Sequence, residues 1–194
     1  AKVLHSRCVE IAKKYGVELL VCSSLNRNSG TMVREKTKME KMLISGVAAD
    51  KNVAKIRVAG LGNDPESTFR LLNLLDRNNL NIDVMIQSLG KDGTKSVSFT
   101  VTKPDMLRTI DVLNDNKDSL GIKKLDYDEN VAKVSVIGAG VRSHSGVAAK
   151  MFGALANAGI NTEMVTTSEI RITALIDEAY ADQAMRAIHE TFLE

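Results

Sequence analysis

Hydrophobic and polar residues alternate along two stretches of the chain that begin with the same four residues. Residues 52–60 read NVAKIRVAG and residues 130–138 read NVAKVSVIG, 78 positions apart. A second matched pair follows, NNLNIDVMIQS at 78–88 and AGINTEMVTTS at 158–168, 80 positions apart. Alternation with a period of two predicts strands that bury one face. Identity at the start of both copies, followed by the same apolar pattern, indicates two homologous modules.

Helical periodicity follows the first strand of each copy and returns near its end. Apolar residues recur there every three or four positions, as on one face of a helix. Pro104 fits the first turn of a helix, and Asp177 suits an N-cap position. The predicted stripes are Phe69, Leu72 and Leu75, then Met106, Ile110 and Leu113 in the first copy, and Val147, Met151, Leu155 and Ala158, then Ala181, Met185, Ile188 and Phe192 in the second.

Two further strands lie between the helices of each copy. They are predicted over 82–86 and 97–101 in the first copy and over 163–167 and 170–176 in the second. The Gly-Lys-Asp-Gly turn at 90–93 is typical of a hairpin. The order β-α-β-β-α needs one more strand to complete the split βαβ sheet of a ferredoxin-like fold.

The missing strands predict how the modules are joined. Residues 122–127 can supply the last strand of the first copy, whereas the sequence stops at Glu194, directly after the second copy's helix. Residues 43–49 (LISGVAA) are a spare strand upstream of the repeat. We therefore expect this strand, or one from another chain, to pair into the second sheet and lock the modules together. The predicted fold class is α+β, with two ferredoxin-like βαββαβ modules.

Residues 1–33 stand outside the repeat. His5 to Tyr15 is predicted to be helical, Glu18 to Cys22 to be a buried strand, and 26–30 to be a polar turn, followed by a charged connector at 34–42. A helix and a strand of this size cannot bury a core alone. They are typical of the detached end of a larger α/β domain.

The composition is that of a folded protein, with 44% hydrophobic and 26% charged residues. No apolar run approaches the roughly 18 residues of a membrane span, and the start lacks the apolar region of a signal peptide. We therefore expect a soluble, cytoplasmic protein. Lys and Arg number 26 against 24 Asp and Glu, a net charge of +2. This balance argues against nucleic acid or a membrane surface as a partner held by general electrostatics.

Motifs for metal binding and catalysis are missing from the sequence. The three histidines lack paired ligand spacing, so no metal is expected, and Cys8 and Cys22 are expected to be reduced and mostly buried. Residues 60–62 lack the third glycine of a dinucleotide fingerprint, and no Walker A run occurs. The Ser-His-Ser run at 143–145 is more typical of a capping turn, because adjacent residues rarely meet in triad geometry. No catalytic residue is predicted.

The clearest chemical feature of each module is the turn from its first strand into its first helix. Backbone N–H groups at a helix start carry partial positive charge and suit a carboxylate. The start of the second strand offers groups for an ammonium, and the two together match the ends of a free amino acid. The turns cover 62–68 and 143–148. The strand starts carry Asn81 and Asp83 in the first module and Asn161 and Glu163 in the second. Gln87, Ser168 and Glu169 are then left to contact the ligand's side chain.

Plain helix capping is the simpler explanation of the same residues. Asn, Asp, Ser and Gly are common before helices because they cap helices and adopt turns, and acids at strand ends are often solvated. The residue types alone therefore leave two interpretations open, a ligand site or ordinary capping.

The same segments resemble a known family, the bacterial aspartate kinases. The opening AKVLHSRCVEIAKKYGVELLV with CSSLNRNSGTMV is similar to the last helix and strand of that family's kinase domain. The segments SGVAADKNVAKIRVAG, NIDVMIQS, VAKVSVIGAG and NTEMVTTSEIRI are similar to its tandem regulatory ACT domains. The resemblance implies an end of a kinase domain with a connector at 1–41, a first ACT domain at 42–127 and a second at 128–194, with strand 43–49 as a candidate to pair into the second.

The resemblance implies an allosteric sensor. Aspartate kinases phosphorylate the β-carboxylate of aspartate with MgATP, and many are inhibited by lysine, threonine or both, which bind between ACT domains of two chains. It therefore implies a homodimer, a free amino acid as effector, and a catalytic kinase domain or subunit as partner. The family's phosphate-binding motif, a Lys followed by an aromatic residue and paired glycines, is missing here. We expect the chain alone to hold no cofactor and to phosphorylate nothing.

Carried over residue by residue, the effector positions fall on the turns and strand starts described above. Glu66, where glycine is usual, and Thr162, where an apolar residue is common, depart from the family pattern. Asp83 or Glu169 is expected to read a cationic group. The alternatives are a ferredoxin-like dimerisation module without ligand and a small enzyme. The implied effector-binding residues are Asn63, Asp64, Pro65, Glu66, Ser67, Thr68, Asn81, Ile82, Asp83 and Gln87, and in the second module Val147, Ala148, Asn161, Thr162, Ser168 and Glu169.

Overall fold

The chain forms two compact units, Ala1–Lys41 and Met42–Glu194, which are described separately. The computed structural model describes residues 4–25, 30–33, 44–139, 141 and 146–193. Among the helices in these ranges, none is both long and apolar enough to cross a membrane.

The first unit is a helix followed by a two-stranded ribbon. Helix α1 (Ser6–Lys14) precedes β1 (Leu19–Val21), which pairs antiparallel with β2 (Thr31–Val33). The predicted helix and strand are therefore present, but the expectation of a buried strand is wrong, because Leu20 is 59% exposed. Cys8 and Cys22 are exposed as well, against expectation. A unit this small has no core in which to bury them. Most of the predicted polar turn and connector lie outside the described residues.

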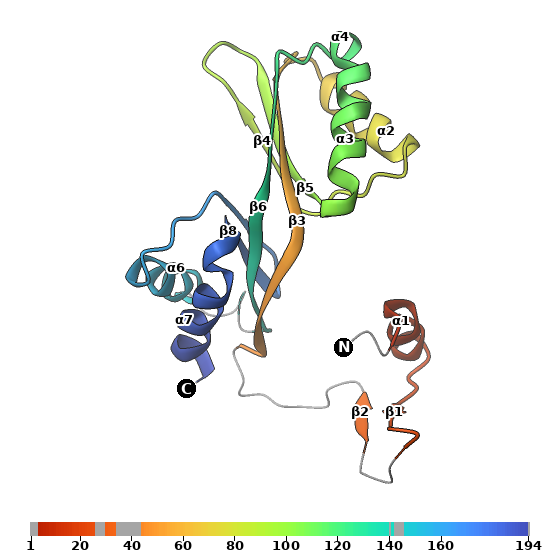
Figure 1. Cartoon of the computed structure of the whole chain (residues 1–194), viewed down its shortest axis with the longest axis vertical. Helices are drawn as coiled ribbons and strands as arrows, with labels where there is room; N and C mark the ends of the chain where they lie inside the picture. The colour runs from red at the N-terminus through yellow and green to blue at the C-terminus, as the bar shows by residue number, and fades with distance from the viewer. Residues whose placement is uncertain (1–3, 26–29, 34–43, 140, 142–145, 194) are drawn as a thin grey trace. The chain divides into compact units, whose positions relative to one another are not determined.

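The second unit is built on a six-stranded antiparallel sheet in the order β4-β5-β3-β6-β8-β7 (Figure 1). Two of its strands are unusually long and run through both modules. The strands are β3 (Gly46–Leu61), β4 (Met85–Leu89), β5 (Lys95–Val101), β6 (Lys124–Ile137), β7 (Met164–Thr167) and β8 (Arg171–Asp177).

The long strands β3 and β6 pair with each other along both halves of their length, and each half belongs to a different module. The second half of β3 pairs with the first half of β6, from Lys55 opposite Asp128 to Ala59 opposite Lys124. The first half of β3 pairs with the second half of β6, from Gly46 opposite Ile137 to Asp50 opposite Lys133. The strand that completes the second sheet therefore comes from upstream in the same chain. The last strand of the first module and the first strand of the second are one continuous strand.

An approximate two-fold axis relates the two modules. Val53 and Val131 occupy the same position of the repeat, 78 residues apart, and they face each other in the β3–β6 register. Register shifts lie on both sides of Val53. A residue that pairs with the equivalent residue of the other module must lie beside the two-fold axis. The Val53–Val131 pair therefore marks the centre of the second unit.

The helices cover opposite faces of the sheet in the two modules, as Figure 1 shows on either side of β3 and β6. Side chains alternate across a strand, and Ile56 and Val58 of β3 belong to the first core whereas Val47 and Ala49 pack on the second. The first module carries α2 (Glu66–Arg77), α3 (Lys103–Asp115) and the short α4 (Lys117–Leu120), and the second carries α6 (Val147–Asn157) and α7 (Ala181–Leu193), which follows the 3-10 turn η1 (Glu178–Tyr180).

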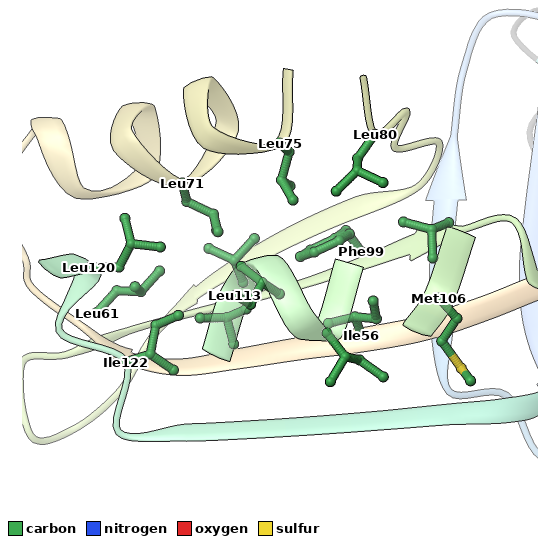
Figure 2. Close-up of a cluster of buried hydrophobic side chains, with 14 of the residues drawn as sticks. Ile56, Leu61, Leu71, Leu75, Leu80, Phe99, Met106, Leu113, Leu120 and Ile122 are labelled. Carbon is green, nitrogen blue, oxygen red and sulfur yellow. The ribbon is translucent and has the colours of Figure 1, made fainter. Parts of the chain in front are cut away.

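Each module has its own hydrophobic core, and a smaller cluster joins them. Figure 2 shows the first core, where Leu71 and Leu75 of α2 meet Phe99 of β5 and Leu113 of α3. The second core lies under α6 and α7. The joining cluster contains buried residues of both modules: Val53, Val84, Val131, Met164 and Leu175.

Most of the predicted apolar stripes are buried, but one helix has a different phase. The stripe of α3 is buried as predicted, as are Val147, Met151 and Leu155 of α6, whereas Ala158 lies just after this helix and is half-buried. In α2, Phe69 is 65% exposed, and the buried face consists of Ser67, Leu71 and Leu75. A spacing of four follows the 3.6-residue turn more closely here than the three-residue spacing chosen from the sequence. Ile170 is also exposed, because β8 begins only at Arg171.

Two leucines of α3 test the assignment of the first core. Leu113 is fully buried (0% exposed), whereas Leu107 on the same helix is 67% exposed. We predict that Leu113→Ala lowers the free energy of unfolding by about 2–5 kcal/mol, because it removes packed methyl groups and leaves a cavity. Leu107→Ala is the matched control and should change it by less than about 0.5 kcal/mol. Urea titration measures both, and equal losses would contradict this packing.

Candidate functional site

The turn into α2 is held by its own polar side chains. Gly60 has φ +87 at a register shift between β3 and β5, where the chain leaves the sheet. The Asp64 carboxylate accepts a hydrogen bond from the Glu66 N–H (3.0 Å). Ser67, only 1% exposed, donates from Oγ to the carbonyls of Gly62 (2.6 Å) and Asp64 (3.1 Å). Two of the predicted site residues therefore also shape the turn, as the capping interpretation requires.

Basic and amide groups surround this turn. The Lys95 ammonium donates to the Asp64 carbonyl (2.8 Å), and the Arg70 guanidinium lies 3.4 Å from the Asp64 carboxylate. Thr68 Oγ1 donates to Gln87 Oε1 on β4 (2.6 Å). The structure thus brings the predicted loop and the predicted Gln87 together. Lys95 and Arg70 were not predicted from the sequence, because the proximity of Lys95 to the turn depends on the register of the hairpin.

The other predicted group of the first module lies at its opposite end. Asn81, Ile82 and Asp83 come directly before β4, and the Asp83 N–H donates to the Thr100 carbonyl (3.1 Å). Thr100 is five residues along β5 from Lys95, a separation of about 17 Å at the usual rise per residue. A single small amino acid therefore cannot touch both groups within one module.

Asp83 forms an ion pair with the other module. Its carboxylate contacts the ammonium of Lys133 on β6, which also lies 3.2 Å from the Asp50 carboxylate. The same contact occurs a second time with the modules exchanged, between Lys55 and Glu163. The sequence repeat contains the residues of both ion pairs, because a lysine follows NVA in each copy and an acidic residue precedes the second strand of each copy. Asp83 was predicted to bind the cationic group of a ligand, but in this structure its carboxylate is already paired with the Lys133 ammonium.

A third ion pair lies across the same junction. The Lys103 ammonium donates to the Glu178 carboxylate at 2.6 Å, and these two residues follow equivalent strands of the two modules. Both side chains are about one third exposed. The junction therefore combines an apolar cluster with three charge pairs around it.

The second module places its predicted residues in the equivalent positions. Val147 and Ala148 begin α6, and Asn161 and Thr162 precede β7. Ser168 donates to the Arg171 carbonyl from its N–H (2.7 Å) and its Oγ (3.2 Å). Glu169 lies in the exposed turn before β8, and residues 143–145 of the predicted turn lie outside the described residues.

Part of the predicted set lies on or next to the two edge strands of the sheet, with residues 81–83 and 87 at β4 and residues 161–162 and 168–169 at β7. The strands β4 and β7 stand at opposite ends of the strand order, so each pairs on one side only. Their outer backbone groups can pair with another chain. Across the described ranges, no group of three His, Cys, Asp or Glu side chains is placed to hold a metal ion.

Comparison with known proteins identifies the family. Residues 134–192 match the ACT domain family. A solved structure of aspartokinase alpha and beta subunits is 42% identical, with a TM-score of 0.72, and the match covers 77% of this chain and 98% of that one. This chain belongs to the aspartokinase family. The regulatory subunit of aspartate kinase from Thermus thermophilus, in a ligand-free form, is 33% identical over 77% of this chain and 99% of that one, with a TM-score of 0.73.

Longer aspartokinases match almost the whole chain. The enzyme of Pseudomonas aeruginosa is 38% identical over 99% of this chain and 47% of its own length, and that of Helicobacter pylori strain 26695 is 41% identical over 99% and 48%. This chain thus spans about half the length of these curated relatives. Escherichia coli aspartokinase III, solved with lysine and aspartate in the T-state, shares the fold at 24% identity and a TM-score of 0.77. The ACT-type fold and the family predicted from the sequence are therefore confirmed.

A double-mutant cycle tests whether the exchanged ion pairs join the modules. We predict a coupling of about 1 kcal/mol between Lys55→Ala and Glu163→Ala in urea unfolding, because both side chains are partly shielded, 25% and 34% exposed. The pair Lys124–Asp126 is more exposed and lies within one module, so its cycle is the control and should give a coupling near zero. Equal couplings in the two cycles would contradict a role for the pair at the junction.

Proposed function

We propose that this chain is the allosteric regulatory part of an aspartokinase, in which lysine, threonine or both bind between ACT domains and inhibit aspartate phosphorylation in the cytoplasm. The supporting observation is that predicted residues flank both edge strands, β4 and β7, at equivalent positions of the two modules, and that the turn at 63–68 contacts β4 through the Thr68–Gln87 hydrogen bond. Because the residues of one module lie too far apart for one ligand, the proposal needs a second chain to complete each site.

Antiparallel pairing of edge strands between two chains would complete the sites. Gln87, beside Thr68, is the middle residue of β4, and Lys95, beside Asp64, pairs with Leu89 at the end of β4, whereas Asn161 and Thr162 precede β7. If β4 of one chain ran antiparallel to β7 of another, the turn at 63–68 would meet Asn161 of the partner subunit. The exchange symmetry of a homodimer would form each such contact twice.

The chemistry of each half then suits one end of an amino acid. The N–H groups at the start of α2, with the Lys95 ammonium beside the turn, provide positive charge for a carboxylate. Asn161 of the partner subunit offers an amide oxygen for the ammonium. Ser67 is not a free ligand group in this arrangement, because its hydroxyl already closes the turn.

The junction of the modules provides a route for the signal. Each strand start that would hold an ammonium also holds an acid paired with a lysine of the other module. A ligand that binds one arrangement of the modules more tightly shifts the equilibrium by that difference, typically about 1–3 kcal/mol. A relative of the same fold, E. coli aspartokinase III, has been solved with lysine in its T-state, which supports an amino acid in this role.

The first unit supports a kinase domain or subunit as the partner. Its described residues expose a run of large apolar side chains that a complete α/β domain would bury. The curated relatives are about twice as long as this chain, and we propose that the corresponding kinase region supplies the cover and the MgATP site. The exposed residues are Leu4, Val9, Ile11, Tyr15, Val17, Leu20, Leu25 and Met32.

Thermal melting with each of the twenty amino acids tests the proposal. We predict that lysine, threonine or both raise the melting temperature by several degrees at about 100 times the Kd, through mass action on the folded state. Thr68→Val removes the hydrogen bond to Gln87 with little change of shape, and should reduce this increase by at least half.

The control is Thr191→Val, since the Thr191 hydroxyl bonds only its own helix, to the Ala187 carbonyl. Sedimentation in the same buffers is expected to show a dimer. A chain that responds to no amino acid would favour the alternative, a dimerisation module without ligand. A monomer that responds fully would contradict a site formed between two chains.

A further inference from the structure

A polar pocket of about 550 Å³ lies between the two modules of one chain. Its floor is the open face of the second module's sheet, where four small residues stand side by side on β3, β6, β8 and β7. The residues of this row are Ala48, Ser135, Thr173 and Thr166. The start of β4, which belongs to the first module, forms one wall. The volume is in the range of small-molecule sites.

The floor is particular to the second module. At the equivalent positions of the first module, Arg57, Ile86 and Asp126 stand in place of Ser135, Thr166 and Ala48, and Ser98 stands in place of Thr173. Three of the four positions therefore carry larger side chains in the first module, and the row of four small residues belongs to the second.

The floor also presents a buried hydroxyl donor. Ser135 and Thr173 are both more than nine-tenths buried, and their hydroxyls are hydrogen-bonded to each other at 2.8 Å. Each hydroxyl has one hydrogen, so this contact uses only one of the two. Among the described residues no acceptor is found for the second hydrogen, and both side chains line the pocket.

The charges at the two ends of the pocket have opposite signs. At one end the Asp50 and Asp83 carboxylates both contact the Lys133 ammonium, so these three side chains of the described part carry a net negative charge. At the other end Arg171 lines the pocket and forms no ion pair with a described residue. Arg171 is paired with Ile137, which lies four residues along β6 from Lys133. The Cα atoms of Ile137 and Lys133 are therefore about 13 Å apart, and this is the approximate spacing between the two charged ends of the pocket.

We propose that this pocket binds a small zwitterion whose ammonium and carboxylate are several bonds apart, as at the two ends of a basic amino acid. The ammonium lies at Asp50 and Asp83, the carboxylate at Arg171, and the chain between them crosses the Ser135–Thr173 hydroxyl pair. The site differs from the proposed interface site because it lies within one chain and includes neither helix start, and the two share Asp83.

The probe 6-aminohexanoate separates this site from the interface. It has the distant ammonium and carboxylate but no α-amino group, so it lacks what the proposed interface recognises. Titration calorimetry on the full chain is expected to show binding of 6-aminohexanoate and at least tenfold weaker binding of hexanoate and hexylamine, each of which lacks one charge. Amide shifts in NMR spectra should concentrate at Ser135 and Thr173.

Two variants complete the test. Asp50→Asn and Arg171→Gln should each weaken 6-aminohexanoate binding about tenfold, while the response to amino acids that depends on Thr68 persists. Asp128→Asn, at the position equivalent to Asp50 in the first module, is the control and should leave binding unchanged. Circular dichroism checks that the variants fold. Absence of binding to the unmodified chain, shifts confined to the turn at 62–68, or unchanged binding in both variants would overturn the proposal.

Discussion

Neither module can complete its own sheet without a strand that also belongs to the other. The strands β3 and β6 each contribute one half to each module, and they pair with each other over most of their length. Pulling the modules apart would break backbone hydrogen bonds in the middle of both sheets and expose the cluster around Val53 and Val131. This shared pair of strands is the constraint on which the rest of the unit depends, because it makes two repeats into one body.

Apolar burial and charge have different parts at the junction. Burying a Val, Leu or Met side chain contributes roughly 1.5–3 kcal/mol, and five such residues meet there. A partly exposed ion pair contributes about 0–1 kcal/mol. The apolar cluster therefore supplies most of the free energy that holds the modules together. Each ion pair joins a lysine of one module to an acid of the other, so these contacts depend on the arrangement of the modules, which is the property that an allosteric ligand biases.

The sequence predicted the fold well because its signals are local and occur twice. The repeat, the period of the strands and the buried stripe of α3 all follow from neighbouring residues, and the lack of a final strand in the second copy pointed to residues 43–49. The phase of α2 was misjudged because Leu71, Leu72, Leu74 and Leu75 offer more than one apolar face, and only packing against β5 decides between them.

The candidate site was harder to predict because it depends on contacts between distant residues. The turn at 62–68 and Gln87 lie together within one module, whereas the strand start at Asn81 and Asp83, which was expected to act with the turn, lies at the opposite end of that module. The pairing of Asp83 with Lys133 and the approach of Lys95 to Asp64 depend on strand register and on the other module, which periodicity does not give. The pocket was missed for the same reason, since its small floor residues are 87 or more positions from Ala48 on three other strands.

Hydrogen exchange along β3 and β6 tests the shared-strand account most directly. Amides of Ile56 and Val58 report on the first module, and those of Val134 and Val136 on the second. If the two modules open only together, all four amides should exchange with one free energy, equal to that of global unfolding from urea titration, within about 1 kcal/mol. Exchange in the second module at a clearly lower free energy, with the first still protected, would show that the modules open independently and would contradict the account.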